Sequence, residues 1–240
     1  MHFPDPLIPG RLQRRYKRFL SDILLEDGSE VVAHCANPGS MMGLAEPASP
    51  VWLSPSRNPA RKLKYSWELV EVPSETGGAL VGINTGRANA LVAEALEAGK
   101  VPELAGYAQR RAEVRYGTNS RVDFLLESPD NPACPPCYVE VKSVTLRRGG
   151  TLAEFPDAVT ARGTKHLAEL AQVAGQGQRA VLFFLVQRGD CTAVAPAADI
   201  DPAYAAALSE ALAAGVEILC YKCNLSPAAV ELDERLPLAL

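Results

Sequence analysis

Two acids and a lysine, Asp123, Glu140 and Lys142, are the residues of this chain whose types and spacing best suit chemistry. Each acid interrupts an apolar run, RVDFLLE (121–127) or CYVEVKSVTL (137–146), with the composition of a mostly buried strand. Residues i and i+2 of a strand face the same side, so Glu140 and Lys142 project together. Asp123 joins them if the two strands are neighbours. Because unpaired buried charges are costly, the trio must hold an ion or bridge internally.

The chemistry that such a trio suits is metal-assisted phosphodiester hydrolysis. Mg²⁺ and Mn²⁺ prefer carboxylate oxygens, together with water and substrate phosphate. The metal would polarise a phosphoryl oxygen and acidify a bound water, which Lys142 would position. The alternative is a structural salt bridge between Glu140 and Lys142, with Asp123 capping a turn. The D…ExK spacing alone favours the structural salt bridge, since structural ion pairs outnumber active sites. The order of the surrounding elements and the family resemblance given below reverse that preference.

Length and composition limit the class of protein that this chain can belong to. The chain has 240 residues, 48% of them hydrophobic and 22% charged, as expected for a globular protein of one or two domains. A net charge of −4 argues against wholesale coating of nucleic acid but leaves room for a local basic patch. No apolar segment follows Met1 and none approaches a membrane span, so a cytoplasmic protein without a membrane partner is expected. The oligomeric state is left open.

Two C-x-x-C pairs, Cys134–Cys137 and Cys220–Cys223, raise the alternative of a four-thiolate zinc site. The pairs lie much further apart than in a compact zinc ribbon. In a strand, Cys220 and Cys223 would also face opposite sides. Reduced cysteines that fill small apolar spaces are therefore favoured over zinc.

The elements that position these residues fall into two groups. Strands are expected over 15–25, 29–35, 51–56, 63–72 and 79–84, which predicts an OB-like barrel in residues 1–85. Residues 86–240 then alternate helices and strands, which predicts an α/β domain with a mixed sheet (α+β overall). Its helices are expected over 88–99, 161–174 and 203–215, and its strands over 112–117, 121–127, 137–146, 179–188 and 216–222.

This α-β-β-β-α-β order resembles the PD-(D/E)xK nuclease superfamily, in which the acids hold the same position. The chain also resembles the sugar fermentation stimulation (SfsA) family along nearly its full length. Matching stretches include RYKRFL (15–20), HCANPGSM (34–41), YGTNSRVDFLLE (116–127), YVEVKSVTL (138–146) and FPDAVTARGTKHLAEL (155–170). The resemblance implies an OB-like domain, a nuclease-like domain, DNA binding and a regulatory effect on the use of sugars, maltose in particular. Asn37-Pro38 departs from the Asn-Thr expected there, so this loop's backbone is in question.

Further candidates surround the trio. Glu94 holds the place of an additional metal-binding acid in such nucleases, although it equally suits an exposed helix face. Arg162 and Lys165 lie near the start of the helix 161–174, where they would bind phosphate. His166 would carry a proton or serve a structural role. Asp157 would cap that helix, and Gln187 would bond the attacking water or face solvent at a strand end.

A basic and aromatic stretch marks the barrel: Arg14, Arg15, Tyr16, Lys17 and Arg18. In a continuous strand, Arg14, Tyr16 and Arg18 would share a face. A second stretch adds Arg57, Arg61, Lys62, Lys64, Tyr65 and Trp67. OB barrels bind nucleic acid through basic grooves with stacking aromatics, so phosphate contacts are expected here. The alternative is a solvated face, with Trp67 in the barrel core.

The sequence therefore predicts a DNA-binding protein with an Mg²⁺- or Mn²⁺-dependent phosphodiesterase centre. A non-catalytic DNA-binding regulator that keeps the nuclease fold, and a zinc-stabilised interaction module, are the alternatives. Whether the chain is an enzyme, and whether its target is DNA or RNA, single- or double-stranded, is left open by the residues alone.

Overall fold

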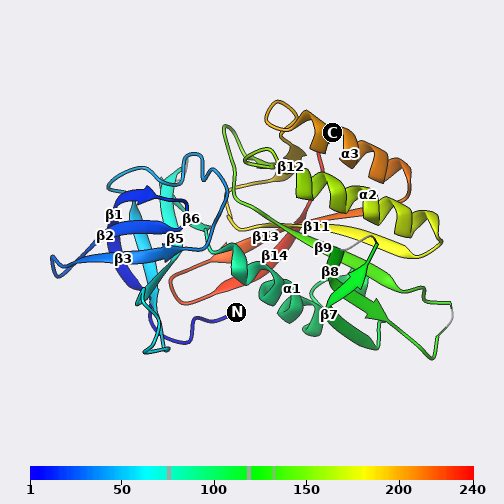
Figure 1. Cartoon of the computed structure of the whole chain (residues 1–240), viewed down its shortest axis with the longest axis horizontal. Coiled ribbons are helices and arrows are strands. Elements are labelled where there is room, and N and C mark those ends of the chain that lie inside the picture. Colours follow the sequence, from blue (N-terminus) through cyan, green and yellow to red (C-terminus); the bar gives the residue numbers. More distant parts are fainter. Residues whose placement is uncertain (75–76, 118–119, 132) are drawn as a thin grey trace.

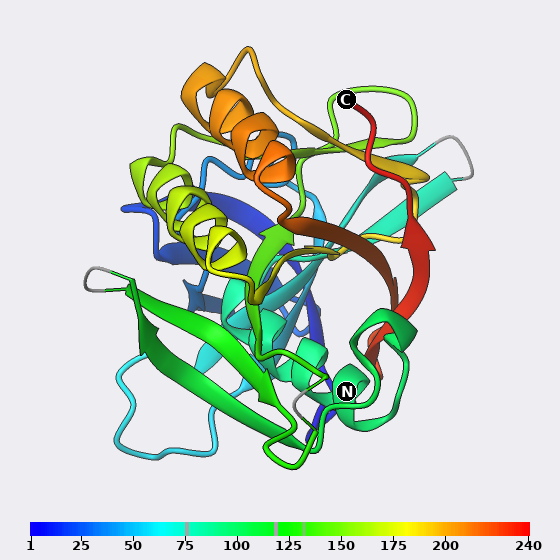
Figure 2. The same ribbon diagram turned by 90° about the vertical axis from the view of Figure 1, so that its right-hand side faces the viewer.

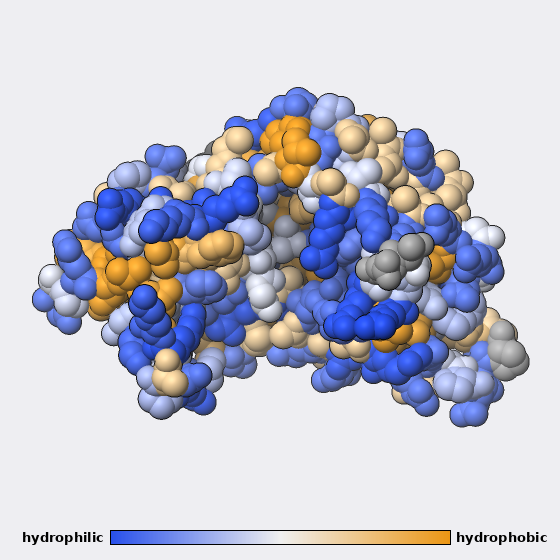
Figure 3. All heavy atoms as spheres, viewed as in Figure 1, coloured by the Kyte–Doolittle hydropathy of each residue, from blue (hydrophilic) through white to orange (hydrophobic). Residues whose placement is uncertain are grey.

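A computed structural model describes residues 1–74, 77–117, 120–131 and 133–240, which form two domains side by side (Figure 1). The predicted OB-like barrel followed by a mixed-sheet domain is confirmed. One face of the molecule is hollowed between the two domains, with hydrophilic side chains along its rim (Figure 3). The turn-rich stretch SPDNPACPP (128–136) predicts an exposed hairpin connection, and its residue 132 lies outside the described residues.

The first domain is a closed barrel. Its strands are β1 (Ile8–Tyr16), β2 (Leu20–Leu25), β3 (Glu30–Cys35), β4 (Pro50–Pro55), β5 (Tyr65–Ser74) and β6 (Gly77–Gly82). They are hydrogen-bonded in the order β3-β2-β1-β4-β5-β6, and β3 also pairs with β5 in parallel, which closes the barrel. Trp67 on β5 is fully buried, and its indole N–H donates to the Leu69 carbonyl at 2.8 Å. The alternative placing Trp67 in the barrel core is thus confirmed.

The single strand predicted over 15–25 is wrong. A tight turn divides it, because Lys17 and Arg18 both adopt left-handed backbone angles, with φ of 50° and 65°. The hairpin loop consists of residues 17–19, since Tyr16 pairs with Leu20, and glycine or asparagine usually signals left-handed positions in such loops. Here two basic residues take them, so the usual signal is missing. Arg14 and Tyr16 therefore lie on β1, whereas Arg18 lies in the turn and shares no strand face with them.

The second domain is a mixed sheet between helical layers. Its helical elements are η1 (Thr85–Arg87), α1 (Ala88–Glu97), η2 (Pro102–Leu104), α2 (Ala161–Gly175) and α3 (Pro202–Ala213). Its strands are β7 (Gln109–Tyr116), β8 (Ser120–Glu127), β9 (Cys137–Val144), β10 (Leu152–Phe155), β11 (Arg179–Val186), β12 (Ala193–Pro196), β13 (Glu217–Leu225) and β14 (Val230–Leu236). The three predicted helices are confirmed; β10, β12 and β14 were not predicted. No helix among the described ranges is long and apolar enough to cross a membrane.

The main sheet runs β14-β13-β11-β9-β8-β7, with β9, β11 and β13 parallel. Side chains of β11 alternate between two core clusters: Phe183 packs into the one that includes α1, and Phe184 into the one that includes α2 and α3. Both faces of the central strand are thus covered, which explains its continuous apolar run. Helices α2 and α3 lie side by side on one face (Figure 2).

Backbone hydrogen bonds join the two domains. The Gly82 N–H at the end of β6 donates to the Gln187 carbonyl just beyond β11 at 2.8 Å, and Val81 forms a bridge with Arg188. At the start of the chain, Phe3 donates to the Ala228 carbonyl of the second domain at 3.0 Å. The domains therefore meet through main-chain pairing as well as through side chains.

Asp157 forms a second link between the domains. Its Oδ2 accepts from the Met41 N–H at 3.0 Å and from the Ser40 hydroxyl at 3.3 Å, both on the loop after β3. A Cβ at Gly39 would lie 2.5 Å from this oxygen, so only glycine fits there without a shift. The expected capping role of Asp157 is wrong, because Thr160 caps α2 by accepting from the Gly163 N–H.

Asp157→Ala is expected to lower the free energy of unfolding by about 1–3 kcal/mol, because hydrogen bonds to an ionised carboxylate are lost and a backbone N–H is left unpaired. Urea unfolding of the full chain measures this change. Asp130→Ala, at an exposed acid in a loop, is the matched control. Equal unfolding midpoints for the two variants would contradict the expectation.

Candidate functional site

The candidate site lies where β8 and β9 separate. The described ladder between them runs from Leu126↔Cys137 to Phe124↔Val139. Asp123 and Glu140 are the next residues on their strands. At this point the Val141 N–H donates to Asp123 Oδ2 at 2.7 Å. The two acids therefore sit at the apex of a fork between the strands.

Asp123 is held from two sides. Besides the Val141 N–H, its Oδ1 accepts from Asn89 Nδ2 of α1 at 2.7 Å. Burial raises the pKa of Asp123, the nearby negative charge of Glu140 raises it further, and the two hydrogen bonds oppose this rise. Asn89 was not predicted; its only signal is a polar residue in the first turn of an otherwise apolar helix.

Glu140 is 3% exposed and has one satisfied oxygen. Its Oε1 accepts from Lys142 Nζ at 2.6 Å and contacts His166 Nδ1 closely. Burial alone would raise the pKa of Glu140, but the hydrogen bond from His166 and the charge of Lys142 outweigh it and hold the pKa below its ordinary value. Oε2 is also buried, and among the described residues it has no hydrogen-bond partner. The anticipated Glu140–Lys142 bridge is thus present but satisfies only half of the carboxylate.

His166 connects Glu140 to Arg162. Arg162 Nε donates to His166 Nε2 across 3.4 Å. Because a guanidinium can only donate, Nε2 must accept, and the proton of the neutral ring then lies on Nδ1, facing Glu140. His166 is 4% exposed. The His166 ring orients the Glu140 carboxylate. These contacts correspond to the structural role that the sequence analysis offered for His166.

Lys165 links α2 to the β7–β8 hairpin. Its Nζ donates to Ser120 Oγ at 3.1 Å and lies 3.6 Å from Glu169 Oε1. Gly117, with φ of 53°, lies against the same glutamate, where a Cβ would come within 2.9 Å of Oε1. The hairpin tip and α2 are therefore packed together beside the fork.

Glu94 is not the α1 residue that reaches the site. Its carboxylate pairs with the Met1 amino group at 2.6 Å, and its side chain is 56% exposed. No group of three or more His, Cys, Asp or Glu residues that could hold a metal occurs in the described part of the chain.

Gln187 and five of the six cysteines are buried, whereas Cys134 is half-buried. Gln187 is 2% exposed and donates to Ser143 Oγ at 2.7 Å, so the alternative of a solvent-facing strand end is wrong. Cys220 packs into the core cluster with α2 and α3, and Cys223 into the cluster with α1, as the strand alternation predicted. Burial raises the pKa of both thiols to about 12.

The predicted basic stretch of the barrel divides into paired and exposed members. Arg14 pairs with Asp22 at 2.7 Å and stacks on Tyr16, and Arg15 donates to the Asn37 and Gly39 carbonyls. The side chains of Lys17, Arg18 and Lys62 are exposed, and Arg61 donates to Ser66 Oγ at 2.9 Å.

An aromatic pair beside these exposed residues was not predicted. Phe19, 48% exposed, stacks on His34 with ring centroids 6.5 Å apart. Arg61 lies close enough that its charge, after burial, lowers the pKa of His34. The β1–β2 turn, β3 and the β4–β5 loop thus join aromatic and basic side chains on one barrel surface, here called the barrel platform: Lys17, Arg18, Phe19, His34, Arg61 and Lys62.

Fold and site together define a two-domain protein in which an OB-type barrel precedes a mixed-sheet domain with one buried and one half-buried carboxylate at a strand fork. Residues 14–83 match the family model described as the SfsA N-terminal OB domain, and residues 86–229 match the sugar fermentation stimulation protein RE domain. The chain belongs to the sugar fermentation stimulation protein family.

Relatives match over the whole chain. A sugar fermentation stimulation protein homolog of Rhodospirillum rubrum is 58% identical over 95% of this chain and 94% of its own length. The homolog of Rhodospirillum centenum is 57% identical over all of both chains. The solved structure of Pyrococcus furiosus SfsA in complex with Ca²⁺ has a TM-score of 0.87 and 27% identity, covering 100% of this chain and 98% of that one.

Proposed function

We propose that this chain is a DNA-binding protein with an Mg²⁺- or Mn²⁺-dependent phosphodiesterase centre of the PD-(D/E)xK type at the fork. The observation that carries the proposal is Glu140 Oε2, a buried carboxylate oxygen without a described partner. A buried acceptor of this kind is costly unless a cation or donor meets it. The Ca²⁺ complex of the Pyrococcus relative supports the proposal, because Ca²⁺ and Mg²⁺ both take oxygen ligands.

Asp123 and Glu140 would hold the cation, which when bound polarises a phosphoryl oxygen and acidifies a water. The chain's own residues supply the rest. Lys142 Nζ donates to Glu140 Oε1 at 2.6 Å, so its charge is fixed beside the carboxylate. From there it would orient the attacking water and stabilise negative charge on the phosphate. His166 turns Glu140 so that Oε1 is occupied and Oε2 is left for the cation.

Binding of the nucleic acid would use the barrel platform together with Arg162 and Lys165 on α2. Exposed cations around a stacked aromatic pair suit a phosphate backbone with bases against the ring faces. Arg162 and Lys165 have exposed side chains near the start of α2, on the helix that carries His166. Their charges would hold phosphates close to the fork.

A non-catalytic DNA-binding regulator is the second candidate. It is favoured by the internal pairing at the fork: Glu140 Oε1 already has Lys142 and His166, and Asp123 already has Asn89 and the Val141 N–H. Such pairing lets the fold persist without an ion. The effect on sugar utilisation that the family name describes would then arise from binding alone.

Cleavage assays separate the two candidates. Purified protein is incubated with labelled single- and double-stranded DNA and RNA in Mg²⁺, Mn²⁺, Ca²⁺ or EDTA. Cleavage in Mg²⁺ or Mn²⁺ that stops in EDTA is the expected result. DNA binding without cleavage in every metal would leave the regulator, and the absence of DNA binding would overturn both candidates.

His166→Ala is expected to weaken cation binding by about 10- to 100-fold, the usual cost of removing a residue that orients a ligand. Isothermal titration with Ca²⁺ measures this without turnover. His166→Asn, whose amide N–H can replace the ring Nδ1–H, is expected to recover much of the affinity. Equal losses in both variants would show that the imidazole does not act by orienting Glu140.

A further inference from the structure

Two arginines oppose each other on the β7–β8 hairpin. Arg115 and Arg121 are direct partners in the antiparallel register, which places two positive charges side by side on one strand face. Like charges in this position destabilise a strand pair. Within the described residues, neither side chain has a hydrogen bond or ion pair to a carboxylate. The hairpin therefore keeps two like charges opposite each other, and no described acid pairs with either of them directly.

Arginines further along the same hairpin behave differently. Arg110 pairs with Glu97, and Arg111 pairs with Glu127 at 2.7 Å. Glu127 ends β8 at the base of the hairpin, and Glu97 ends α1. The neutralised arginines thus support the fold, whereas Arg115 and Arg121 present their charges towards the tip.

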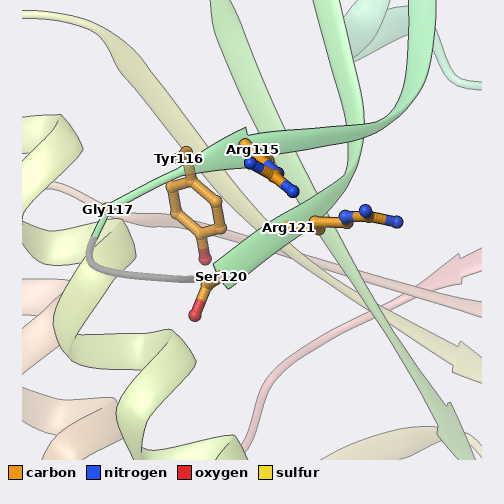
Figure 4. Close-up of a pocket in the computed structure, with 5 residues that line it drawn as sticks. All are labelled: Arg115, Tyr116, Gly117, Ser120 and Arg121. Carbon is orange, nitrogen blue, oxygen red and sulfur yellow. The ribbon is translucent and has the colours of Figure 1, made fainter.

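A pocket of about 440 Å³ lies at this tip, lined by Arg115, Tyr116, Gly117, Ser120 and Arg121. The two arginine side chains extend in the same direction from the hairpin, while the Tyr116 hydroxyl points towards Ser120 (Figure 4). That hydroxyl is buried and has no hydrogen-bond partner among the described residues. Because successive strand residues face opposite sides, this hydroxyl and the two arginines belong to opposite faces of the hairpin, and the arginines alone supply the charge on their face.

The arginine pair also lies next to the fork. Arg121 precedes Asp123 by two residues, so both belong to the same strand face, roughly 7 Å apart along the chain. Arg115 lies across from Arg121 on β7. On the opposite side of the hairpin, Lys165 donates to Ser120 Oγ. A phosphodiester bond placed at Asp123 would therefore have its neighbouring phosphate near the arginines.

We propose that Arg115 and Arg121 form a phosphate clamp for the DNA backbone beside the fork. Their guanidinium groups would bind non-bridging oxygens of one phosphate or of two adjacent phosphates, and the phosphate charge would relieve their mutual repulsion. The clamp rests on the proposed DNA-binding function and assigns the hairpin tip as the point where the strand is held next to the acids. It binds backbone and reads no base sequence.

The test compares Arg115→Gln/Arg121→Gln with Arg111→Gln, a control on the same strand whose arginine already has an acid partner. Binding of a fluorescein-labelled DNA duplex and of the matching single strand is measured in Ca²⁺ at several salt concentrations. The double variant is expected to lose about 100-fold in affinity. The slope of log K against log salt should fall in magnitude by about 1.8 for the duplex or about 1.4 for the single strand.

A salt slope and affinity within the range of the Arg111→Gln control would overturn the clamp. The catalytic proposal can fail independently of the clamp. If DNA is bound but never cut, the phosphodiesterase proposal is contradicted, while the affinities and salt slopes still test the clamp. A wild-type protein that binds neither DNA probe overturns both. Thermal unfolding midpoints check folding, and little change is expected because Arg115 and Arg121 are exposed.

Discussion

Glu140→Gln is expected to reduce metal-dependent cleavage by about 10³-fold or more. Glutamine keeps the size of the side chain but removes the negative charge that the proposed cation needs. The amide oxygen can still accept from Lys142 and His166 at the place of Oε1, which puts the NH₂ group at the place of Oε2, where the cation would bind. The substitution therefore replaces a cation ligand by a hydrogen-bond donor.

The matched control is Glu127→Gln, an acid on the neighbouring strand whose partner is Arg111. Initial rates on labelled DNA in Mg²⁺ and Mn²⁺ measure the first effect, and Ca²⁺ titration measures loss of cation binding independently of turnover. Retention of wild-type rates by Glu140→Gln, with Glu127→Gln also at wild-type level, would rule out the fork as the reactive centre.

Glu68→Ala is expected to lower the free energy of unfolding by about 3–5 kcal/mol, the usual cost of removing one member of a buried ion pair. The Glu68 side chain is 1% exposed, and Arg87 donates to its two oxygens at 2.6 and 2.7 Å. Ser54 and Asn84 add donors at 2.6 and 2.9 Å. Without the carboxylate, the half-buried Arg87 charge and these polar groups lose their common acceptor.

Urea or thermal unfolding measures the loss. Glu30→Ala, at an exposed glutamate on β3, should change stability by no more than about 0.5 kcal/mol. Glu68→Ala/Arg87→Ala should cost less than the sum of the two single changes, because the second change removes the stranded charge. Additive losses would show that the two side chains do not act as a pair.

Glu68 also shows that a sequence pattern alone does not distinguish a structural ion pair from a candidate metal site. Like Asp123 and Glu140, it is an acid within an apolar strand run, and the pattern is the same for all three. The structure distinguishes them by the hydrogen bonds to each oxygen: both oxygens of Glu68 receive donors, whereas Glu140 Oε2 receives none from the described residues. The donors come from residues distant in sequence, so no local spacing predicts them.

The elements were predictable where local periodicity determines them. The helices at 88–97 and 161–175 and the apolar strand at 179–186 follow from their repeating apolar positions. Asn89 and Glu94 show what periodicity does not predict. Both lie on α1, but the packing of α1 against the sheet brings Asn89, and not Glu94, to Asp123. The Lys17–Arg18 turn was missed because two residues that rarely adopt left-handed angles do so here.

The main-chain pairing between β6 and the end of β11 fixes how far the barrel platform lies from the two acids at the fork. A flexible linker would let the barrel platform sample many distances from the acids. Paired backbone between Gly82 and Gln187 instead makes that distance a property of the fold. A strand held on the platform would meet Asp123 and Glu140 a set number of nucleotides away, so the length of any product would report the geometry of the protein rather than the sequence of the DNA.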